Sequence, residues 1–595
     1  MTRRLTLLLV VSLAAMLGAP EAHAQRLGVA IAEGLSCDVS APFSDPAIRG
    51  TVVPLKLQFS NGGPERGIRV VLESYGSVSA VFTLRGEGSS TRWLYVPVPG
   101  DALFGATLKF YDDRTGELLK EWVWGNLRLS RSGAPSGTFA YPISGTISGL
   151  SDEMAVLVVA GARRPALPGS LAGSSSLSVS QASPGDLPDS WLGLCGFNII
   201  LVTGEAWNSS RMDVEAVLDW VAMGGLCLVA GASPEEQEAA VRQIEGRSPL
   251  TRRTDGTVWA GMGCIRFVDE EEARQLPLSD RRMGVRRNVI DVRAGRDSWH
   301  PLLQVDDRPP FAFVLVILIS FSLLVGPLGW WYVVGKKKRP LVYYAVVPLA
   351  SLSVVIAVVV ADMVAQGFRP WAACMATELL DQRSQRRVTM SQFAVYCPST
   401  VGRRLRGAPD ELPGFVSLSE GDSRRGFSAF GLGGLRVIYA ADGPIYDGAL
   451  PSRTKAWYST QRLRLARERL EVWKENGRIH VENHLGAPLR GLVVAYEGEY
   501  AAFERLAEGE SASADPLAAA EAVRLSRSVA MKGPDQFRGG YVSDYGPTAM
   551  CRRWQQAFDS GQNAFIAVRD GKYEELIWLD SARFTYCNSV IRGVF

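Results

Sequence analysis

This sequence of 595 residues contains little histidine and has a small net charge. There are four histidines, and the 64 Lys and Arg residues nearly cancel the 61 Asp and Glu residues. Without a basic excess there is no indication of a nucleic-acid-binding surface, and without acidic tracts there is none of a disordered acidic tail. A chain of this length exceeds what one hydrophobic core supports, so we expect about three or four domains.

Motifs for nucleotide, metal and hydrolase chemistry are missing as well. The sequence has no P-loop, no G-x-G-x-x-G, no H-E-x-x-H and no G-x-S-x-G. No C-x-x-C or Cys/His spacing suggests a metal, and His480 with His484 has no evident third ligand. The sequence therefore predicts no cofactor, no metal site and no catalytic residue.

The first 24 residues have the three regions of a cleavable signal peptide. Arg3 and Arg4 precede an apolar run at 5–17, which is too short to span a bilayer comfortably. Small residues at Ala22 and Ala24 then predict cleavage before Gln25. A retained N-terminal anchor is the alternative.

Two long uncharged runs predict a pair of transmembrane helices, at 311–334 and 341–363, joined by a loop at 335–340. Each uncharged run is long enough to cross about 30 Å of hydrocarbon at about 1.5 Å per residue. Two buried core helices are the alternative, which the strongly basic loop disfavours. Asp362 is expected to be a solvated carboxylate at the outer interface, with an ion path as the alternative.

The short loop between these helices predicts their orientation. Its four positive charges place it in the cytoplasm: Lys336, Lys337, Lys338 and Arg339. Aromatic residues of the kind that favour the membrane interface flank it: Trp330, Trp331, Tyr332, Tyr343 and Tyr344. With the signal peptide cleaved, residues 25–310 and 364–595 would lie outside the cytoplasmic membrane of a bacterium, facing the periplasm or exterior.

All eight cysteines then lie in an oxidising compartment, where disulfides can form. The candidate disulfide cysteines are two pairs, Cys374 with Cys397 and Cys551 with Cys587, although spacing leaves their connectivity open. Cys227 lies in an apolar strand-like run, and we expect it to be a buried thiol.

Alternating apolar residues predict a β-sandwich at 25–147. Every second residue of 53–59 is apolar, and Ile68, Val70 and Leu72 resume the alternation. A turn at 112–116 predicts a hairpin. Short strands with turns about every ten residues are typical of immunoglobulin-like sandwiches, which serve as spacers or binding surfaces.

From 148 to 300 the pattern changes to alternating strands and helices, which indicates an α/β domain. Three apolar runs predict strands of a mostly parallel sheet: 154–160, 198–202 and 226–229. Ser210 is the expected N-cap of a helix, whose apolar face would comprise Val214, Val217, Leu218 and Val221. Ser233 opens a second helix with a capping box.

This domain resembles class I glutamine-amidotransferase-like domains over about residues 155–232, through the segment FNIILVTGEAWNSSRMDVEAVLDWVAMGGLCLVAGAS. In that family a strand, a helix ending in W/Y-V-x-x-G-G and a second strand recur. The resemblance implies a cysteine nucleophile at the turn after the second strand and a histidine later in the chain. Here that turn is Ala230-Gly231-Ala232, and Cys227 lies about three residues too early. Cys195 precedes a strand instead of following one.

Residues 364–595 are expected to be mainly β. Predicted strands are 392–396, a hairpin of 478–482 with 489–496, and a hairpin of 565–568 with 575–579. We expect a loop or short helix at 507–520, a helix near 548–558 and a solvated basic surface at 462–468.

Two hypotheses for function follow. The first is a non-enzymatic, membrane-anchored extracytoplasmic binding or assembly component, whose outer domains bind the envelope, a ligand or, as the favoured partner, a protein of the envelope. The overall layout resembles uncharacterised bacterial membrane proteins, some of them accessories of gliding-motility-type ABC exporters. The alternative is an envelope hydrolase or amidotransferase-like enzyme that uses Cys227. Alanine at position 230 and the lack of a matching histidine favour the first.

Overall fold

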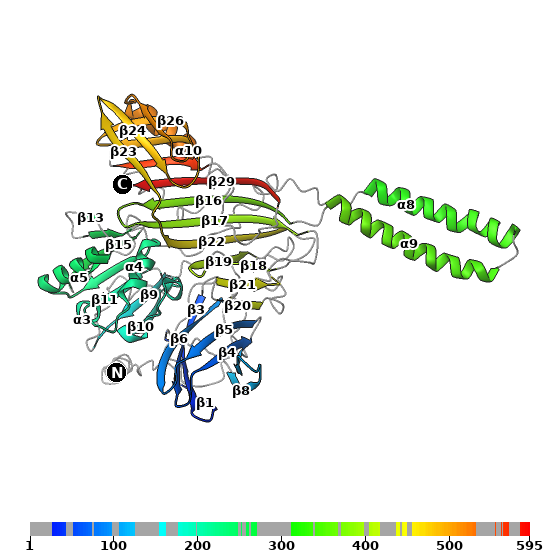
Figure 1. The fold of residues 1–595 in the computed structure, drawn as a ribbon, viewed down its shortest axis with the longest axis horizontal. Helices are drawn as coiled ribbons and strands as arrows, with labels where there is room; N and C mark the ends of the chain where they lie inside the picture. The colour runs from blue at the N-terminus through cyan, green and yellow to red at the C-terminus, as the bar shows by residue number, and fades with distance from the viewer. Residues whose placement is uncertain are drawn as a thin grey trace, which may run out of the picture.

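The computed structural model describes a mainly-β, multidomain protein from which two helices project as a long hairpin (Figure 1). The described residues are 27–42, 52–73, 77–97, 106–124, 154–161, 177–197, 199–247, 251–252, 257–260, 263–269, 311–336, 340–366, 370–397, 404–416, 436–440, 443–448, 455–530, 554, 558, 561, 563–569 and 583–595. The predicted signal peptide lies outside them. The parts within 27–269 and 370–595 are called the body below.

Two sheets around one core form a sandwich near the N-terminus. One sheet contains β1 (Leu27–Ala32), β2 (Leu35–Ser40), β3 (Val52–Asn61) and β6 (Gly88–Pro97). The other contains β4 (Arg66–Glu73), β5 (Ser77–Leu84), β7 (Ala106–Asp112) and β8 (Leu118–Trp124). The predicted alternation is confirmed in β4, where Ile68, Val70 and Leu72 are buried. The Asp112 carboxylate accepts hydrogen bonds from two backbone N–H groups of the predicted turn.

Strands from beyond the helical hairpin extend the second sheet of this sandwich. They are β18 (Leu405–Arg406), β20 (Arg436–Ala440) and β21 (Gly443–Asp447). β20 runs parallel to β5, and Ile438 is the partner of Ser79. The complete order is β18-β21-β20-β5-β4-β7-β8. The sequence predicted separate domains at 25–147 and 364–595, whereas the structure has strands from both segments in one sheet.

A seven-stranded sheet forms the α/β part. Five parallel strands are β9 (Met154–Val159), β10 (Leu177–Ala182), β11 (Ile199–Thr203), β12 (Leu226–Ala230) and β15 (Gly263–Val268). β14 (Thr257–Ala260) and β13 (Thr251–Arg252) add an antiparallel edge. The order is β10-β9-β11-β12-β15-β14-β13. β10 therefore lies at the edge of the sheet, and β9 lies between β10 and β11.

The helices of this part are α3 (Gly204–Trp207), α4 (Val214–Ala222) and α5 (Pro234–Arg247). The predicted apolar face of α4 is buried. Ser210 as its N-cap is wrong: Asp213 caps the helix, because its carboxylate accepts the Ala216 N–H at 3.1 Å. The capping box of α5 is confirmed, since Ser233 Oγ accepts the Glu236 N–H and Glu236 accepts the Ser233 N–H.

The W-V-x-x-G-G motif has a packing explanation. Gly224 ends α4 with φ of +108°, a left-handed conformation that favours glycine. The ring of Trp220 lies on Gly225, where an added Cβ would come within 2.4 Å of ring carbons. At Gly263 a Cβ would meet the carbonyl oxygen of Val221 at 2.1 Å. The motif therefore brings helix, turn and strand into close contact.

The helical hairpin consists of α8 (Phe311–Leu323), the π-helical turns η5 (Leu324–Leu328) and η6 (Trp330–Lys336), and α9 (Pro340–Gln366). Among the described residues, Leu315–Tyr332 is long and apolar enough to cross a membrane, and none of it is buried. A shorter apolar stretch, Val347–Val358, lies in α9. Gly326, with ψ of −105°, breaks the first helix beside Pro327, which cannot donate a backbone hydrogen bond.

The C-terminal part has two sheets. The larger has the order β19-β22-β17-β16-β29-β28-β25-β26 and the smaller β23-β24-β27. Their bounds are β16 (Trp371–Asp381), β17 (Arg386–Tyr396), β19 (Glu411–Val416), β22 (Lys455–Leu465), β23 (Arg469–Glu475), β24 (Arg478–His484), β25 (Leu489–Tyr496), β26 (Glu499–Leu506), β27 (Ser511–Ala514), β28 (Ala564–Arg569) and β29 (Arg583–Val594). One apolar cluster lies between the two sheets, with Ile479 from one and Leu492 from the other.

The predicted hairpin of 478–482 with 489–496 is wrong. β24 pairs with β23 and β27, whereas β25 pairs with β26 and β28. The buried Asn483 makes the corner between the two sheets: its Oδ1 accepts the Leu485 N–H at 3.0 Å and its Nδ2 donates to Ala487 O at 2.9 Å.

Other C-terminal predictions have mixed outcomes. Strands at 392–396 and 565–568 are confirmed within β17 and β28, while 575–579 lies outside the described residues. For the segment 507–520 we predicted a loop or short helix. It contains the strand β27, and α10 (Ala519–Ala530) begins at its end. The basic stretch is not simply solvated: Arg464 is ion-paired with Glu468 at 2.6 Å.

The predicted disulfide between Cys374 and Cys397 is wrong. Cys374 lies opposite Phe393 in the β16·β17 ladder, and Cys397 follows Phe393 by four residues. At about 3.3 Å per residue this offset is roughly 13 Å, against a Cα limit of about 7 Å for a disulfide. The two buried residues are not bonded to each other. Cys551 lies outside the described residues, so its pairing with Cys587 stays a prediction.

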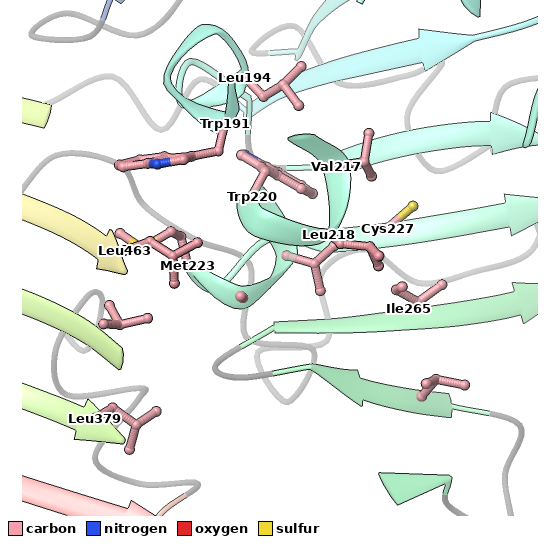
Figure 2. Packing of buried hydrophobic residues seen from close by; sticks show 14 of the residues in the cluster. Trp191, Leu194, Val217, Leu218, Trp220, Met223, Cys227, Ile265, Leu379 and Leu463 are labelled. Carbon is pink, nitrogen blue, oxygen red and sulfur yellow. The ribbon is translucent and has the colours of Figure 1, made fainter. Parts of the chain in front are cut away.

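The α/β part packs directly on the larger C-terminal sheet. Trp191, Trp220 and Met223 lie opposite Leu379 and Leu463 of that sheet, and all five belong to one buried cluster (Figure 2). Polar contacts also join the parts: Lys56 to Asp186 at 2.7 Å, Tyr95 Oη to Asp189 at 2.5 Å and Arg386 to Asp219 at 2.6 Å. The segments before and after the helical hairpin therefore fold together.

Candidate functional site

The carboxyl edge of the parallel sheet contains the candidate binding site. The chain passes from β9 to β10 on one side and returns as β11 on the other, so the ends of β9 and β11 form a topological switch point. In open α/β sheets ligands bind outside the carboxyl ends of the strands at such a point. Gly161 follows β9, and Gly204 and Glu205 follow β11.

A glycine and a carboxylate lie side by side at this switch point. A Cβ added to Gly161 would lie 2.7 Å from Cδ of Glu205, and both residues are exposed. Thr203 Oγ1 accepts the Ala206 N–H at 3.2 Å and so begins α3, which places Glu205 in the first turn of that helix. The edge can accept hydrogen bonds from cationic or hydroxyl groups of a partner.

Neither Gly161 nor Glu205 was identified from the sequence. Gly161 directly follows the apolar run 154–160, and Glu205 follows the run 198–202 by three residues. Their position just after a predicted strand is the signal that could have found them. Recognising the switch point also required the strand order, which only the structure supplies.

The turn after β12 has the conformation of an elbow but bears no reactive side chain. Gly231 has φ of +66°, and its N–H donates to Val268 O at 3.1 Å. Ala230 and Ala232, which flank it, are 3% and 9% exposed. A Cβ on Gly204 would lie 2.8 Å from Cα of Ala232, so this turn and the one after β11 touch.

The two cysteines of the α/β part that the sequence singled out are both buried. Cys227 is the second residue of β12 and lies among Val217, Leu218 and Ile265 (Figure 2). Burial, with a smaller contribution from Cys264, raises the pKa of the Cys227 thiol far above its ordinary value. The thiolate, which is the nucleophile, is therefore strongly disfavoured at neutral pH.

We expect iodoacetamide at neutral pH to leave Cys227 unmodified in the native full-length protein and to modify it after unfolding in urea. Mass spectrometry of the Cys227 peptide measures both results. The reason is that the side chain is fully buried and its thiolate is unfavourable. Rapid modification of the native protein would instead support the alternative of a Cys227 enzyme.

His480 and His484 share the outer face of β24, as their spacing predicted. His480 stacks on Trp473, with ring centroids 5.4 Å apart. Ligand atoms of His484, Glu482 and Glu471 lie within 4.8 Å of one another and could hold a cation. An Arg469 nitrogen 2.5 Å from Glu471 already supplies positive charge there, and the cluster is not buried.

The sequence could not show Glu471 and Glu482 as partners, because they meet through the register of β23 with β24. His300 lies outside the described residues.

The predicted interface aromatics lie near the tip of the helical hairpin. Four are well exposed in the absence of lipid: Trp330, Trp331, Tyr332 and Tyr344. Lys336 Nζ lies 5.7 Å from the ring centroid of Trp331. The side chains of Lys337, Lys338, Arg339, Tyr343 and Asp362 lie outside the described residues.

Comparison with known proteins adds no family assignment. No protein-family model matches the chain, and no curated protein matches it.

Proposed function

We propose that this chain is a non-enzymatic, membrane-anchored binding or assembly component whose body lies outside the cytoplasm. The observation that carries the proposal is the parallel pairing of β20 with β5. β5 precedes the helical hairpin in the sequence and β20 follows it. Because the two strands share a sheet, the segments before and after the hairpin must lie on the same side of the membrane. The hairpin then crosses twice, through α8 and α9.

The direction of crossing follows from charge. The loop between the helices carries Lys336 and the next three basic residues, which favours the cytoplasmic side. The body is then in the periplasm or at the exterior, in agreement with the signal-peptide pattern at residues 1–24. In this topology the short basic loop is the part that faces the cytoplasm, so the body is the part that would bind a partner.

The carboxyl edge of the α/β sheet is the proposed recognition surface. Among its described residues, from Gly161, Thr203 to Glu205 and Ala230 to Ser233, there is no cysteine or histidine. The resemblance to amidotransferase-like domains supports a fold that keeps its scaffold without the nucleophile and presents its loops instead. A protein of an envelope or export assembly is the proposed partner.

Site-specific photocrosslinking in intact membranes tests this surface. A photoreactive residue at Asn208, exposed beside α3, should yield one discrete adduct, whereas the same residue at exposed Glu117 on the β7–β8 turn should not. The Asn208 adduct should disappear when Glu205 is changed to Arg. Equal adducts at both positions, or an adduct indifferent to Glu205→Arg, would argue against recognition at this edge.

A further inference from the structure

The larger C-terminal sheet consists of two antiparallel halves joined at a single seam. One half is β19-β22-β17-β16 and the other is β29-β28-β25-β26. Among the described strands of this sheet, β16 with β29 is the one parallel pair. β16 begins soon after α9 ends, and β29 lies at the C-terminus, so the seam joins the membrane-anchored half to the C-terminal half (Figure 1).

Two cysteines occupy partner positions in the strand register across this seam. In the β16·β29 register Cys374 is the direct partner of Cys587, just past a bulge beside Ala373. Directly opposed residues of neighbouring strands belong to the same face of a sheet. Neighbouring strands lie about 4.8 Å apart, within the range of about 4.4–6.8 Å between Cα atoms that disulfides span.

Cys374 has no sulfur–sulfur bond in the structure, and we infer that oxidation joins it to Cys587 in a disulfide that crosslinks this seam. The inference rests on the proposed extracytoplasmic location, because disulfides persist in oxidising compartments. It replaces both pairings suggested by sequence spacing: Cys397 is too far along the ladder to reach Cys374, and Cys587 is opposite Cys374.

The bond forms by thiol–disulfide exchange with a disulfide-bonded oxidoreductase or a small-molecule disulfide. One thiolate attacks the oxidant's disulfide and gives a mixed disulfide, and the second thiolate displaces the oxidant's remaining sulfur. The two cysteines lose two protons and two electrons, and the oxidant's disulfide is reduced to two thiol groups. Cys374 is completely buried in the finished fold, so exchange takes place before the seam closes.

The test is mass spectrometry of the full-length protein isolated from its own membranes. Thiols are blocked with N-ethylmaleimide during lysis, and digestion uses pepsin at acid pH, where thiolate exchange is suppressed. We expect a peptide containing Cys374 joined to one containing Cys587, which separates on reduction. Cys397→Ser should keep the linked species, and Cys374→Ser should abolish it.

Two further outcomes would overturn the inference in different ways. If both cysteines are blocked as isolated but link when the reduced protein is refolded with glutathione disulfide, the pairing geometry holds and the oxidising location fails. If no link forms under either condition, or Cys374 is found joined to another cysteine, the pairing itself is wrong.

Discussion

Replacing Glu378 by alanine is expected to destabilise the body by roughly 3 kcal/mol. The Glu378 carboxylate contacts the Arg387 guanidinium, and both side chains are completely buried. The Ser589 hydroxyl donates a hydrogen bond to this carboxylate, and Arg569 Nη1 lies 3.7 Å from it. Removing the carboxylate leaves a buried cation, which costs more than the pair contributes. Glu468, 3.3 Å from Arg387, compensates in part.

The loss is measured as a shift of the urea unfolding midpoint of the full-length protein in detergent. Glu475→Ala, at an exposed position of β23, is the matched control and should change stability by less than about 0.5 kcal/mol. Replacing both partners, by Glu378→Leu with Arg387→Met, should recover most of the loss because the two completely buried charges are removed together and Glu468 keeps its ion pair with Arg464. An E378A protein as stable as the control would contradict the buried pair.

Trp220→Ala is expected to cost about 3–5 kcal/mol, because it removes a large, completely buried side chain. The indole packs on Gly225 and lies where α4 meets the larger C-terminal sheet (Figure 2). Its Nε1 has no hydrogen-bond partner, so Trp220→Phe loses no bond. The phenylalanine variant should therefore lose far less, on the order of 1.5 kcal/mol.

Urea unfolding of the two variants, followed by far-ultraviolet circular dichroism, separates these expectations. The same samples under limited proteolysis should show earlier cleavage of the α/β part in Trp220→Ala than in Trp220→Phe. Equal losses for the two variants would mean that the indole N–H, and not the packing of the ring, is what the site requires.

Local features were predictable from the sequence because their signals are local. Alternation in β4 and the apolar face of α4 were confirmed, as was the capping box at Ser233. The N-cap of α4 was misplaced because Ser210 and Asp213 are both good capping residues, and only the backbone path shows which carbonyl and N–H groups begin the helix.

Pairing between distant segments was not predictable. Nothing in 436–440 marks it as a partner of β5, since strand patterns specify a buried face and not a neighbour. β24 and β25 illustrate the same limit: adjacent strands with a turn between them predict a hairpin, yet the corner at Asn483 sends them into different sheets. The candidate site and the Cys374–Cys587 register both depend on such pairings.

Labelling of single engineered cysteines with a membrane-impermeant maleimide tests the central claim most directly, namely that both flanks of the helical hairpin lie outside. Val123 and Leu465, 64% and 78% exposed, report the segments before and after the hairpin. We predict that Val123→Cys and Leu465→Cys react with the maleimide in intact spheroplasts. Lys337→Cys, in the loop, should react only after the spheroplasts are lysed. Reaction of Lys337→Cys in intact spheroplasts, or protection of either body position, would contradict the account.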